Sequence, residues 1–345
     1  MNELIKIAQQ RFSLQKEYLG ESKKVNQIEP LVSICVITYQ HKNFIKECID
    51  GILMQKVNFP YEIIIGDDGS TDGTTEICKT FADNYPDKIR LFIRDRKLSQ
   101  YQNEITGRVT RFNGVWVRMS ARGKYLAICE GDDFWTDADK LQKQINFMET
   151  HPEYSMCFHN AIEHYESGEK KDKNFSNVYD KDYSGVEIYK KWIVPTASVV
   201  LKSCVIHNNL YIKSIFNNNF IYGDIVLFLS CAHEGKIRGF SDCMSVYRRH
   251  EGGMVFKKSY NQDLVRLNHD LAIYQTFGEK YKAAALNAFA FFSIDRCFMY
   301  SLQHNETKTR YDILWNALKK APFYSIKRII IYTIKKIIRY NSPGQ

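Results

Sequence analysis

Tyr61–Asp72 reads YEIIIGDDGSTD, an apolar run that ends in an acidic turn. The β-branched residues of this run are typical of a strand that is buried on both faces of a sheet. A similar run, Leu31–Ile37, precedes it, and a stretch with apolar residues three and four positions apart separates the two. Strand, helix and strand with short connections predict an open parallel sheet.

The pattern continues after the acidic turn. Ser70 or Thr71 is expected to cap the helix that comes next. The further elements that we expect are a helix at 73–84, a strand at 89–93, a loop at 94–104, a helix at 107–121 and a strand at 125–129. The predicted fold class is therefore α/β, with a mostly parallel central sheet and helices on both of its faces.

Two acidic clusters follow strands of this predicted sheet. Asp67-Asp68 ends one strand, and Glu130–Asp133 (EGDD) directly follows another. Each cluster alone is equally consistent with a turn or a helix cap. Parallel strands, however, bring their carboxyl ends to one edge, where converging carboxylates repel each other unless a cation or a donor-rich ligand lies between them. Because Mg²⁺ and Mn²⁺ bind carboxylates together with phosphates, the pattern favours a metal-assisted nucleotide-diphosphate site.

Glycine-rich phosphate loops are missing from the sequence. A dinucleotide site needs GxGxxG after its first strand, where this chain has Thr38-Tyr39-Gln40-His41. The P-loop pattern GxxxxGK[ST] does not occur. We therefore expect a metal, rather than a glycine-rich turn, to hold the phosphates.

Three stretches resemble family 2 of the glycosyltransferases: Leu31–Tyr39 (LVSICVITY), Glu62–Asp72 (EIIIGDDGSTD) and Gly123–Trp135 (GKYLAICEGDDFW). They occur in the order and spacing of that family, and the resemblance covers about residues 30–255. It implies an inverting enzyme of the GT-A fold that takes its sugar from a nucleotide diphosphate donor, with a UDP-sugar favoured, and uses Mn²⁺ or Mg²⁺.

The resemblance also implies roles for individual residues. Glu130 departs from the family, which often has Asp there, and a turn residue is the alternative reading of His250. The implied site consists of Thr38 and Tyr39 at the base and ribose, Asp68 on the base, Asp132 near the ribose and the metal, Asp133 as principal metal ligand, His250 near the metal, and Arg108 or Arg111 as a basic residue of the donor site.

Asp224 is the last polar residue before an apolar, helix-like run. By sequence alone it reads as a helix N-cap. The resemblance implies instead that it is the general base, since inverting members place their base carboxylate at this point. Such a group would take the proton of the acceptor hydroxyl as the new glycosidic bond forms.

The predicted organisation has three parts. Residues 1–29 are expected to be an extension outside the core, and residues 256–345 a helical C-terminal region. Between them we expect a GT-A domain over 30–255, with a nucleotide-sugar-binding half at 30–135 and an acceptor-binding half at 136–255. The segment 322–340 predicts a basic amphipathic helix whose Ile face lies either on an anionic membrane or on the protein itself.

Composition bounds the class of protein and its location. The 345 residues include 48 Lys and Arg against 39 Asp and Glu, a net charge of +9, which we assign to a membrane surface or a phosphate-bearing substrate rather than to nucleic acid. Nine Cys without a CxxC pair, and no apolar run long enough to span a bilayer, predict a cytoplasmic protein, or one peripheral at the inner face of the plasma membrane.

The expected function is transfer of a sugar to a glycan or lipid-linked acceptor in polysaccharide biosynthesis. Two alternatives stay open on the sequence. One is a nucleotidyltransferase, whose usual basic phosphate loop near the first strand is missing here. The other is a nucleotide-sugar-binding protein with an inactive site, against which the intact Asp68, Asp132, Asp133 and Asp224 argue.

Overall fold

The structure is a computed structural model that describes residues 3–18, 20, 22, 24–102, 109–253, 260–298 and 307–340. Within these ranges, the side chains of 260–265, 297–298, 307–310 and 335–340 are not described. The chain forms two compact units. Unit 1 consists of residues 1–216 and 230–250, and unit 2 of residues 217–229 and 251–345.

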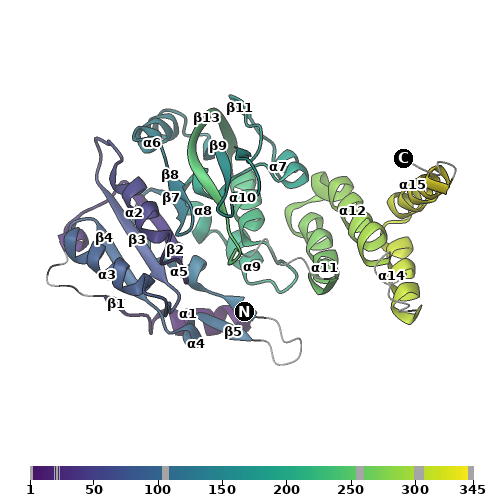
Figure 1. The fold of residues 1–345 in the computed structure, drawn as a ribbon, viewed down its shortest axis with the longest axis horizontal. Helices are drawn as coiled ribbons and strands as arrows, with labels where there is room; N and C mark the ends of the chain where they lie inside the picture. The colour runs from purple at the N-terminus through teal and green to yellow at the C-terminus, as the bar shows by residue number, and fades with distance from the viewer. Residues whose placement is uncertain are drawn as a thin grey trace. The chain divides into compact units, whose positions relative to one another are not determined.

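The elements run in the following order along the chain (Figure 1). The strands are β1 Glu17–Tyr18, β2 Val32–Thr38, β3 Tyr61–Asp67, β4 Ile89–Ile93, β5 Gln100–Gln102, β6 Val109–Arg111, β7 Tyr125–Glu130, β8 Phe134–Trp135, β9 Tyr154–Tyr165, β10 Lys173–Asn174, β11 Lys181–Asp182, β12 Val200–Lys202 and β13 Lys236–Arg249. The helices of unit 1 are α1 Glu3–Phe12, α2 Ile45–Leu53, α3 Thr74–Asn84, α4 Arg96–Ser99, α5 Asn113–Met119, α6 Lys140–Thr150, α7 Gly185–Lys191, α8 Cys204–His207 and α9 Asn209–Ile215, with 3₁₀ turns η1 Lys24–Gln27 and η2 Thr196–Ser198. α10 Gly223–Glu234 has residues in both units, and unit 2 adds α11 Tyr260–Phe277, η4 Glu279–Tyr281, α12 Lys282–Ala290, the π-helix η5 Phe291–Phe298, α14 Thr307–Lys320 and α15 Pro322–Tyr340.

One large sheet organises unit 1. Its strand order is β1-β4-β3-β2-β7-β12-β9-β13-β11, with β10 paired to β9 and β8 to β13. The pairs β4–β3, β3–β2, β2–β7 and β9–β13 are parallel, whereas β12 is antiparallel to both of its neighbours. The predicted α/β class with a mostly parallel sheet is therefore confirmed.

The first half of the sheet follows the sequence closely. Every residue of β3 is buried, and the predicted strands at 31–37, 89–93 and 125–129 are found as β2, β4 and β7 within one residue or two. α2 turns the apolar residues that recur at three and four positions onto the core. Burial of the β-branched residues on both faces is the physical reason for this agreement.

Two local predictions in this half are wrong. The residue before α3 is Gly73, with φ of 105°, and no side chain caps that helix, so neither Ser70 nor Thr71 is its N-cap. The helix expected at 107–121 is shorter, since α5 begins only at Asn113. Residues of β6 before it pair with β5 in a separate two-stranded sheet, and the expected loop at 94–104 contains α4 and β5.

The N-terminal segment packs on unit 1, so the expectation that it lies outside the core is wrong. α1 buries Leu4, Ile5 and Ala8 in a cluster with Phe112, Trp116 and others. β1 adds an antiparallel edge strand beside β4. Apolar residues of α1 spaced three and four apart give it a one-sided face that needs a partner.

The second half of the sheet depends on long-range pairing. β9, twelve residues long, has no counterpart in the sequence prediction, and β13 is a 14-residue strand. β13 pairs with β9 in parallel, with irregularities in register, and ends directly before His250. This pairing brings residues near 250 to the sheet edge that carries the acidic clusters.

Unit 2 is helical in its described residues, as the sequence predicts for 256–320 and 322–340. Leu267, Leu271, Phe289, Ala290 and Ala321 form its buried cluster. None of the helices in the described part of the chain is long and apolar enough to cross a membrane.

A candidate nucleotide and metal site

The carboxyl ends of β2, β3 and β7 meet at one edge of the sheet. The register pairs Thr38 with Asp67 across β2 and β3, and Ile37 with Glu130 across β2 and β7. The segments that follow these strands, 39–41, 68–72 and 131–133, therefore start side by side. This is the edge at which open α/β sheets bind their ligands.

Asp67 organises the turn after β3. Its side chain is fully buried and accepts hydrogen bonds from the backbone and hydroxyl of Ser70, at 3.2 and 2.5 Å, and from the Thr75 hydroxyl. The turn in return holds the loop after β2, because Gln40 N–H donates to Ser70 Oγ and His41 N–H donates to Thr74 Oγ1, both at 2.9 Å. The GSTDGT stretch therefore fixes the position of His41.

Asp68 lies beside a stacked pair of side chains. The Arg96 guanidinium lies 3.4 Å from the centre of the Tyr39 ring, and its Nη1 is 3.5 Å from Asp68 Oδ2. Ser99 donates its hydroxyl to the other oxygen of Asp68. Burial raises the pKa of the Asp68 carboxyl, and the hydrogen bond from Ser99 and the neighbouring arginine charges offset only part of that rise.

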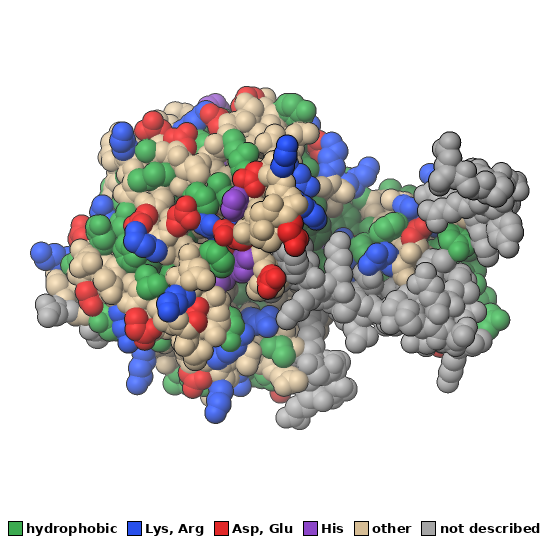
Figure 2. Space-filling view, in the orientation of Figure 1, with side chains coloured by type: hydrophobic (Ala, Val, Ile, Leu, Met, Phe, Trp, Pro, Cys, Tyr) green, Lys and Arg blue, Asp and Glu red, His purple; other side chains and the backbone are tan. Residues whose placement is uncertain are grey.

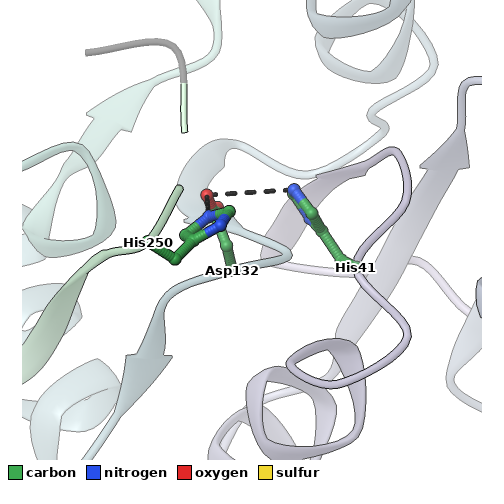
Figure 3. A group of neighbouring side chains, drawn as sticks. All are labelled: His41, Asp132 and His250. Carbon is green, nitrogen blue, oxygen red and sulfur yellow. Dashed lines mark hydrogen bonds and ion pairs between the residues drawn. The ribbon is translucent and has the colours of Figure 1, made fainter. Parts of the chain in front are cut away.

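His41, Asp132 and His250 form a compact group that could hold a metal ion. One ligand atom from each lies within 4.8 Å of the others. His250 Nε2 is 3.0 Å from Asp132 Oδ2, and His41 Nε2 is 3.8 Å from the same oxygen (Figure 3). Figure 2 shows histidine side chains beside carboxylates on the face that it draws. The three residues come from the loop after β2, the turn after β7 and the end of β13.

The protonation states of this group suit metal binding. Burial lowers the pKa of His41 more than the Asp132 charge raises it, so the imidazole is neutral at pH 7 and offers a lone pair. Burial alone would raise the pKa of Asp132, but the hydrogen bond from His250 and the electrostatic interaction with both neighbouring histidines bring it below its usual value. The carboxylate is therefore ionised.

Gly131 allows the three segments to approach. A Cβ at this position would lie 2.9 Å from the Thr38 side chain and 3.1 Å from His41 Nδ1. A larger residue would push the loop after β2 away from Asp132. The glycine between the acidic residues of EGDD is thus required by close packing.

Asp133 is buried behind the group, with only 1% of its surface exposed. Its Oδ1 accepts a 2.9 Å hydrogen bond from the Arg248 backbone, and its Oδ2 has no hydrogen-bond partner among the described residues. Burial, followed by the charges of Asp132 and Glu130, raises the pKa of Asp133 well above its usual value. The role of principal metal ligand, expected for Asp133, stays a prediction.

Arg248 ties the site to the surrounding elements. Its Nε donates to the Asp132 carbonyl at 2.7 Å, and its two terminal nitrogens pair with Glu47 on α2 and Glu166 after β9. The guanidinium also lies over the rings of Phe44 and Phe134. Because each nitrogen of the guanidinium has a protein partner, Arg248 holds the site together rather than facing it.

The other predicted site residues fall in different places. Arg108 lies outside the described residues, and Arg111, exposed at the end of β6, is near enough to lower the pKa of Asp68. Asp224 lies in unit 2, in the first turn of α10, where its Oδ1 accepts the Ile225 N–H at 2.9 Å. It is the second residue of that helix rather than the residue that precedes it.

His41 and Arg248 are the residues whose roles the sequence reasoning missed. His41 follows the first parallel strand at the same edge as both acidic clusters, a signal that was present in the sequence. The contacts of Arg248 require knowledge of the β9–β13 pairing, which no local pattern gives.

Comparison with known proteins shows a similarity to glycosyltransferases. Residues 33–107 match the model of glycosyl transferase family 2. Over this segment, which is less than a quarter of the chain, the protein is similar to family 2 glycosyltransferases. An uncharacterised protein of Mycobacterium tuberculosis is 35% identical over 224 residues, which are 65% of this chain and 60% of that protein. The chain therefore spans about 60% of the length of this curated relative.

Two further similarities concern a glucosyltransferase and the fold. The Escherichia coli protein WfaP, a UDP-Glc:α-D-GlcNAc-diphosphoundecaprenol β-1,3-glucosyltransferase, is 26% identical over 249 residues, or 70% of this chain and 85% of that protein. Staphylococcus aureus TarS, solved with UDP-GlcNAc, matches 84% of this chain and 81% of its own with a TM-score of 0.57 and 16% identity. At that identity the match shows the fold alone, which is the GT-A fold.

Proposed function

We propose that this chain is an inverting, metal-dependent glycosyltransferase that moves a sugar from a nucleotide diphosphate to an acceptor hydroxyl. The observation that carries the proposal is the convergence of His41, Asp132 and His250 beside Asp68 and Tyr39 at one sheet edge. A metal group and a base-binding group at the same edge suit the two ends of a nucleotide diphosphate.

We assign binding of the donor nucleotide to Thr38, Tyr39, Asp68 and Asp132. Tyr39 has 37% of its surface exposed and offers an aromatic face to a base, once the stacked Arg96 side chain moves or shares that face. The Asp68 carboxylate can accept a base N–H, and Arg111, or Arg108, supplies positive charge for phosphate. A UDP-sugar is the proposed donor, as in WfaP and TarS by their names and ligands.

The residues present fit a divalent cation. His41 Nδ1 and Asp133 Oδ2 are buried polar atoms without hydrogen-bond partners in the described part of the chain, and two imidazoles with a carboxylate favour Mn²⁺ over Mg²⁺. His41, Asp132 and His250 would hold the ion, and Asp133 is proposed as a further ligand. The bound cation would stabilise the negative charge of the departing nucleoside diphosphate.

Asp224 is proposed as the general base. A sugar hydroxyl is a weak nucleophile, and a carboxylate within hydrogen-bond reach can take its proton as the bond to the anomeric carbon forms. The nucleoside diphosphate then leaves from the opposite face, so a single displacement inverts the anomeric centre. The support for Asp224 is its place in the family pattern.

The acceptor is proposed to be a glycan or lipid-linked sugar in polysaccharide biosynthesis. WfaP, by its name, acts on a sugar attached to diphosphoundecaprenol. A lipid-linked acceptor would lie at a membrane surface, so the proposal includes peripheral contact of the chain with the inner face of an anionic membrane.

The test is a panel of UDP-Glc, UDP-GlcNAc, a GDP-sugar and a nucleoside triphosphate, each with Mn²⁺, Mg²⁺ or EDTA. We expect a UDP-sugar to raise the melting temperature only with metal, and to release UDP when acceptor is added. The anomeric configuration of the product, read by NMR, should be inverted. Pyrophosphate release from the triphosphate would indicate a nucleotidyltransferase, and stabilisation without turnover on any acceptor would indicate a binding protein.

A further inference from the structure

The helix α15 of unit 2 packs its polar side inward. Ser325 is fully buried, and its hydroxyl donates to the Ala317 carbonyl at 2.9 Å. Arg328 Nη1 lies 3.5 Å from Asp295 Oδ2, and the guanidinium covers the Phe291 ring. Tyr324 packs against the buried cluster of the unit. The side of α15 that contacts the protein is therefore not its isoleucine side.

The opposite side of α15 is apolar and exposed. Phe323 has 71% of its surface exposed, and Ile326, Ile330 and Ile334 have 50%, 53% and 50%. At 100° per residue these four side chains fall within about 80° of arc, on one row of the helix. Phe323, Ile326 and Ile330 line a hollow together with Lys327 and Ile331. We call the four exposed residues the α15 apolar face.

Of the two alternatives that the sequence left open, the contacts of α15 favour the membrane. A helix that docks on its own protein buries its apolar stripe, whereas α15 leaves that stripe outside and buries Ser325. An exposed row of large apolar side chains is unfavourable in water and marks a surface that binds something.

The charge of the sequence in and around α15 identifies the partner. From Ile313 to Gln345 the sequence has no Asp or Glu and seven basic residues, which are Lys319, Lys320, Lys327, Arg328, Lys335, Lys336 and Arg339. Lys319, Lys320 and Lys327 are exposed. A second copy of the chain would bring like charges together, whereas anionic headgroups complement them.

We infer that the α15 apolar face lies in the interface of an anionic lipid bilayer, with the helix parallel to the membrane plane. Four large apolar side chains enter the region between headgroups and acyl chains, and Lys327 beside them, with the other exposed lysines of this region, pairs with lipid phosphates. No described helix could span the bilayer, which agrees with this parallel placement. The inference deepens the lipid-linked acceptor of the proposed function.

The test is co-sedimentation of the full chain with vesicles, in the absence of donor and acceptor. Neutral phosphatidylcholine vesicles are compared with vesicles that contain a quarter phosphatidylglycerol. We expect binding to the anionic vesicles only, weakened by salt. The variant Ile326→Ser/Ile330→Ser/Ile334→Ser should lose at least tenfold in partition coefficient, and Lys319→Gln/Lys320→Gln/Lys327→Gln should lose binding and salt dependence together.

The matched control removes three exposed apolar side chains elsewhere, Leu14→Ser/Met54→Ser/Tyr179→Ser, whose positions are 55%, 38% and 61% exposed. It should bind vesicles as the wild type does, and circular dichroism should show the same helix content for all variants. Equal vesicle binding by the isoleucine variant and the control would overturn the inference. The inference would also be overturned if the wild type did not bind vesicles but formed a dimer in light scattering, and the isoleucine variant lost that dimer. Since the assay needs no sugar transfer, the proposed function can fail without affecting this result.

Discussion

The backbone N–H of Arg248 donates a 2.9 Å hydrogen bond to Asp133 Oδ1, which joins two residues 115 positions apart in the chain. The same arginine donates its Nε to the carbonyl of Asp132. The turn that carries the acidic motif and the strand that ends directly before His250 are thus held together by one residue. The relative positions of Asp132 and His250 depend on this connection.

Replacement of Arg248 should weaken metal binding without unfolding the protein. Arg248→Met removes the bridge from Glu47 to Glu166, and we expect Mn²⁺ affinity to fall about tenfold or more, as is usual for residues that orient metal ligands. Arg248→Lys should not rescue it, since one ammonium cannot reach both carboxylates and the carbonyl. Isothermal titration with Mn²⁺ measures the effect. Arg249→Met, which removes a pair with Glu163 and a contact with the Tyr247 ring, is the control, and equal affinities for the two Met variants would contradict the assignment.

Replacement of His41, Asp132 or His250 should lower metal-dependent transfer more than replacement of an exposed histidine elsewhere does. We expect Asp132→Asn, His41→Ala and His250→Ala each to lower metal-dependent transfer by about 100-fold, because each removes one donor atom of the group. His207→Ala, at an exposed position, is the matched control. Steady-state rates over a range of Mn²⁺ concentrations separate weaker metal binding from a slower reaction.

Asp133→Ala distinguishes the two carboxylates. If Asp133 is a metal ligand, its replacement should lower metal-dependent transfer as much as the replacement of Asp132 does. Unchanged transfer in Asp133→Ala would exclude that role.

Asp224→Asn tests the general base. The amide keeps the size of the side chain but cannot take a proton, so we expect kcat to fall between about 100-fold and 10,000-fold with donor affinity unchanged. Asp242→Asn, at a partly exposed carboxylate paired with Lys143, should leave kcat as it is. Near wild-type transfer by Asp224→Asn would remove this residue from the mechanism.

A buried ionic cluster should dominate the acid sensitivity of unit 1. Glu62 on β3 is fully buried, with its carboxylate bonded to Ser33, Arg122 and Arg90. Burial alone would raise the pKa of Glu62, but the hydrogen bonds from Arg122 and Ser33 and the Arg90 charge lower it below its usual 4.5. A carboxyl whose folded pKa is lowered stabilises the protein above its unfolded pKa, and that stability is lost as the pH falls through the folded value.

We therefore expect Glu62→Gln to lower the free energy of unfolding by about 2 kcal/mol at pH 7, and by progressively less as the pH drops below about 4.5. Glu149→Gln is the same substitution at an exposed pair with Lys124, and should cost less than about 1 kcal/mol. Urea unfolding at several pH values measures both. A difference between wild type and Glu62→Gln that does not change with pH would contradict this account.

The predictable part of the fold is the part made by local patterns. β2, β3, β4 and β7 are short β-branched runs buried on both faces, and their ends could be read from the acidic turns that follow. β9 was not predicted, because its residues are mixed polar and aromatic and only the pairing with β12 and β13 makes it a strand. Likewise, β6 forms through its pairing with β5 in a stretch where a helix was expected.

Some residues of the candidate site could likewise be predicted from local sequence patterns, and others could not. Asp68, Asp132 and Asp133 could be predicted because they stand at the ends of recognisable strands. His41 was passed over since a single histidine in a turn carries no ligand spacing, and its place beside Asp132 depends on the hydrogen bond from its amide to Thr74. The three-residue group arises from the fold, not from a contiguous motif.

The late position of β13 has a consequence for synthesis of the chain. His250 and Asp132 are 118 positions apart, and the strand that brings them together is the last of the sheet to be made. A nascent chain that ends before residue 250 has the acidic motif and the donor-side residues, but it has neither Arg248 in place nor the second histidine. The ribosome must therefore synthesise nearly the whole of unit 1 before His41, Asp132 and His250 can come together, and unfinished chains lack this group.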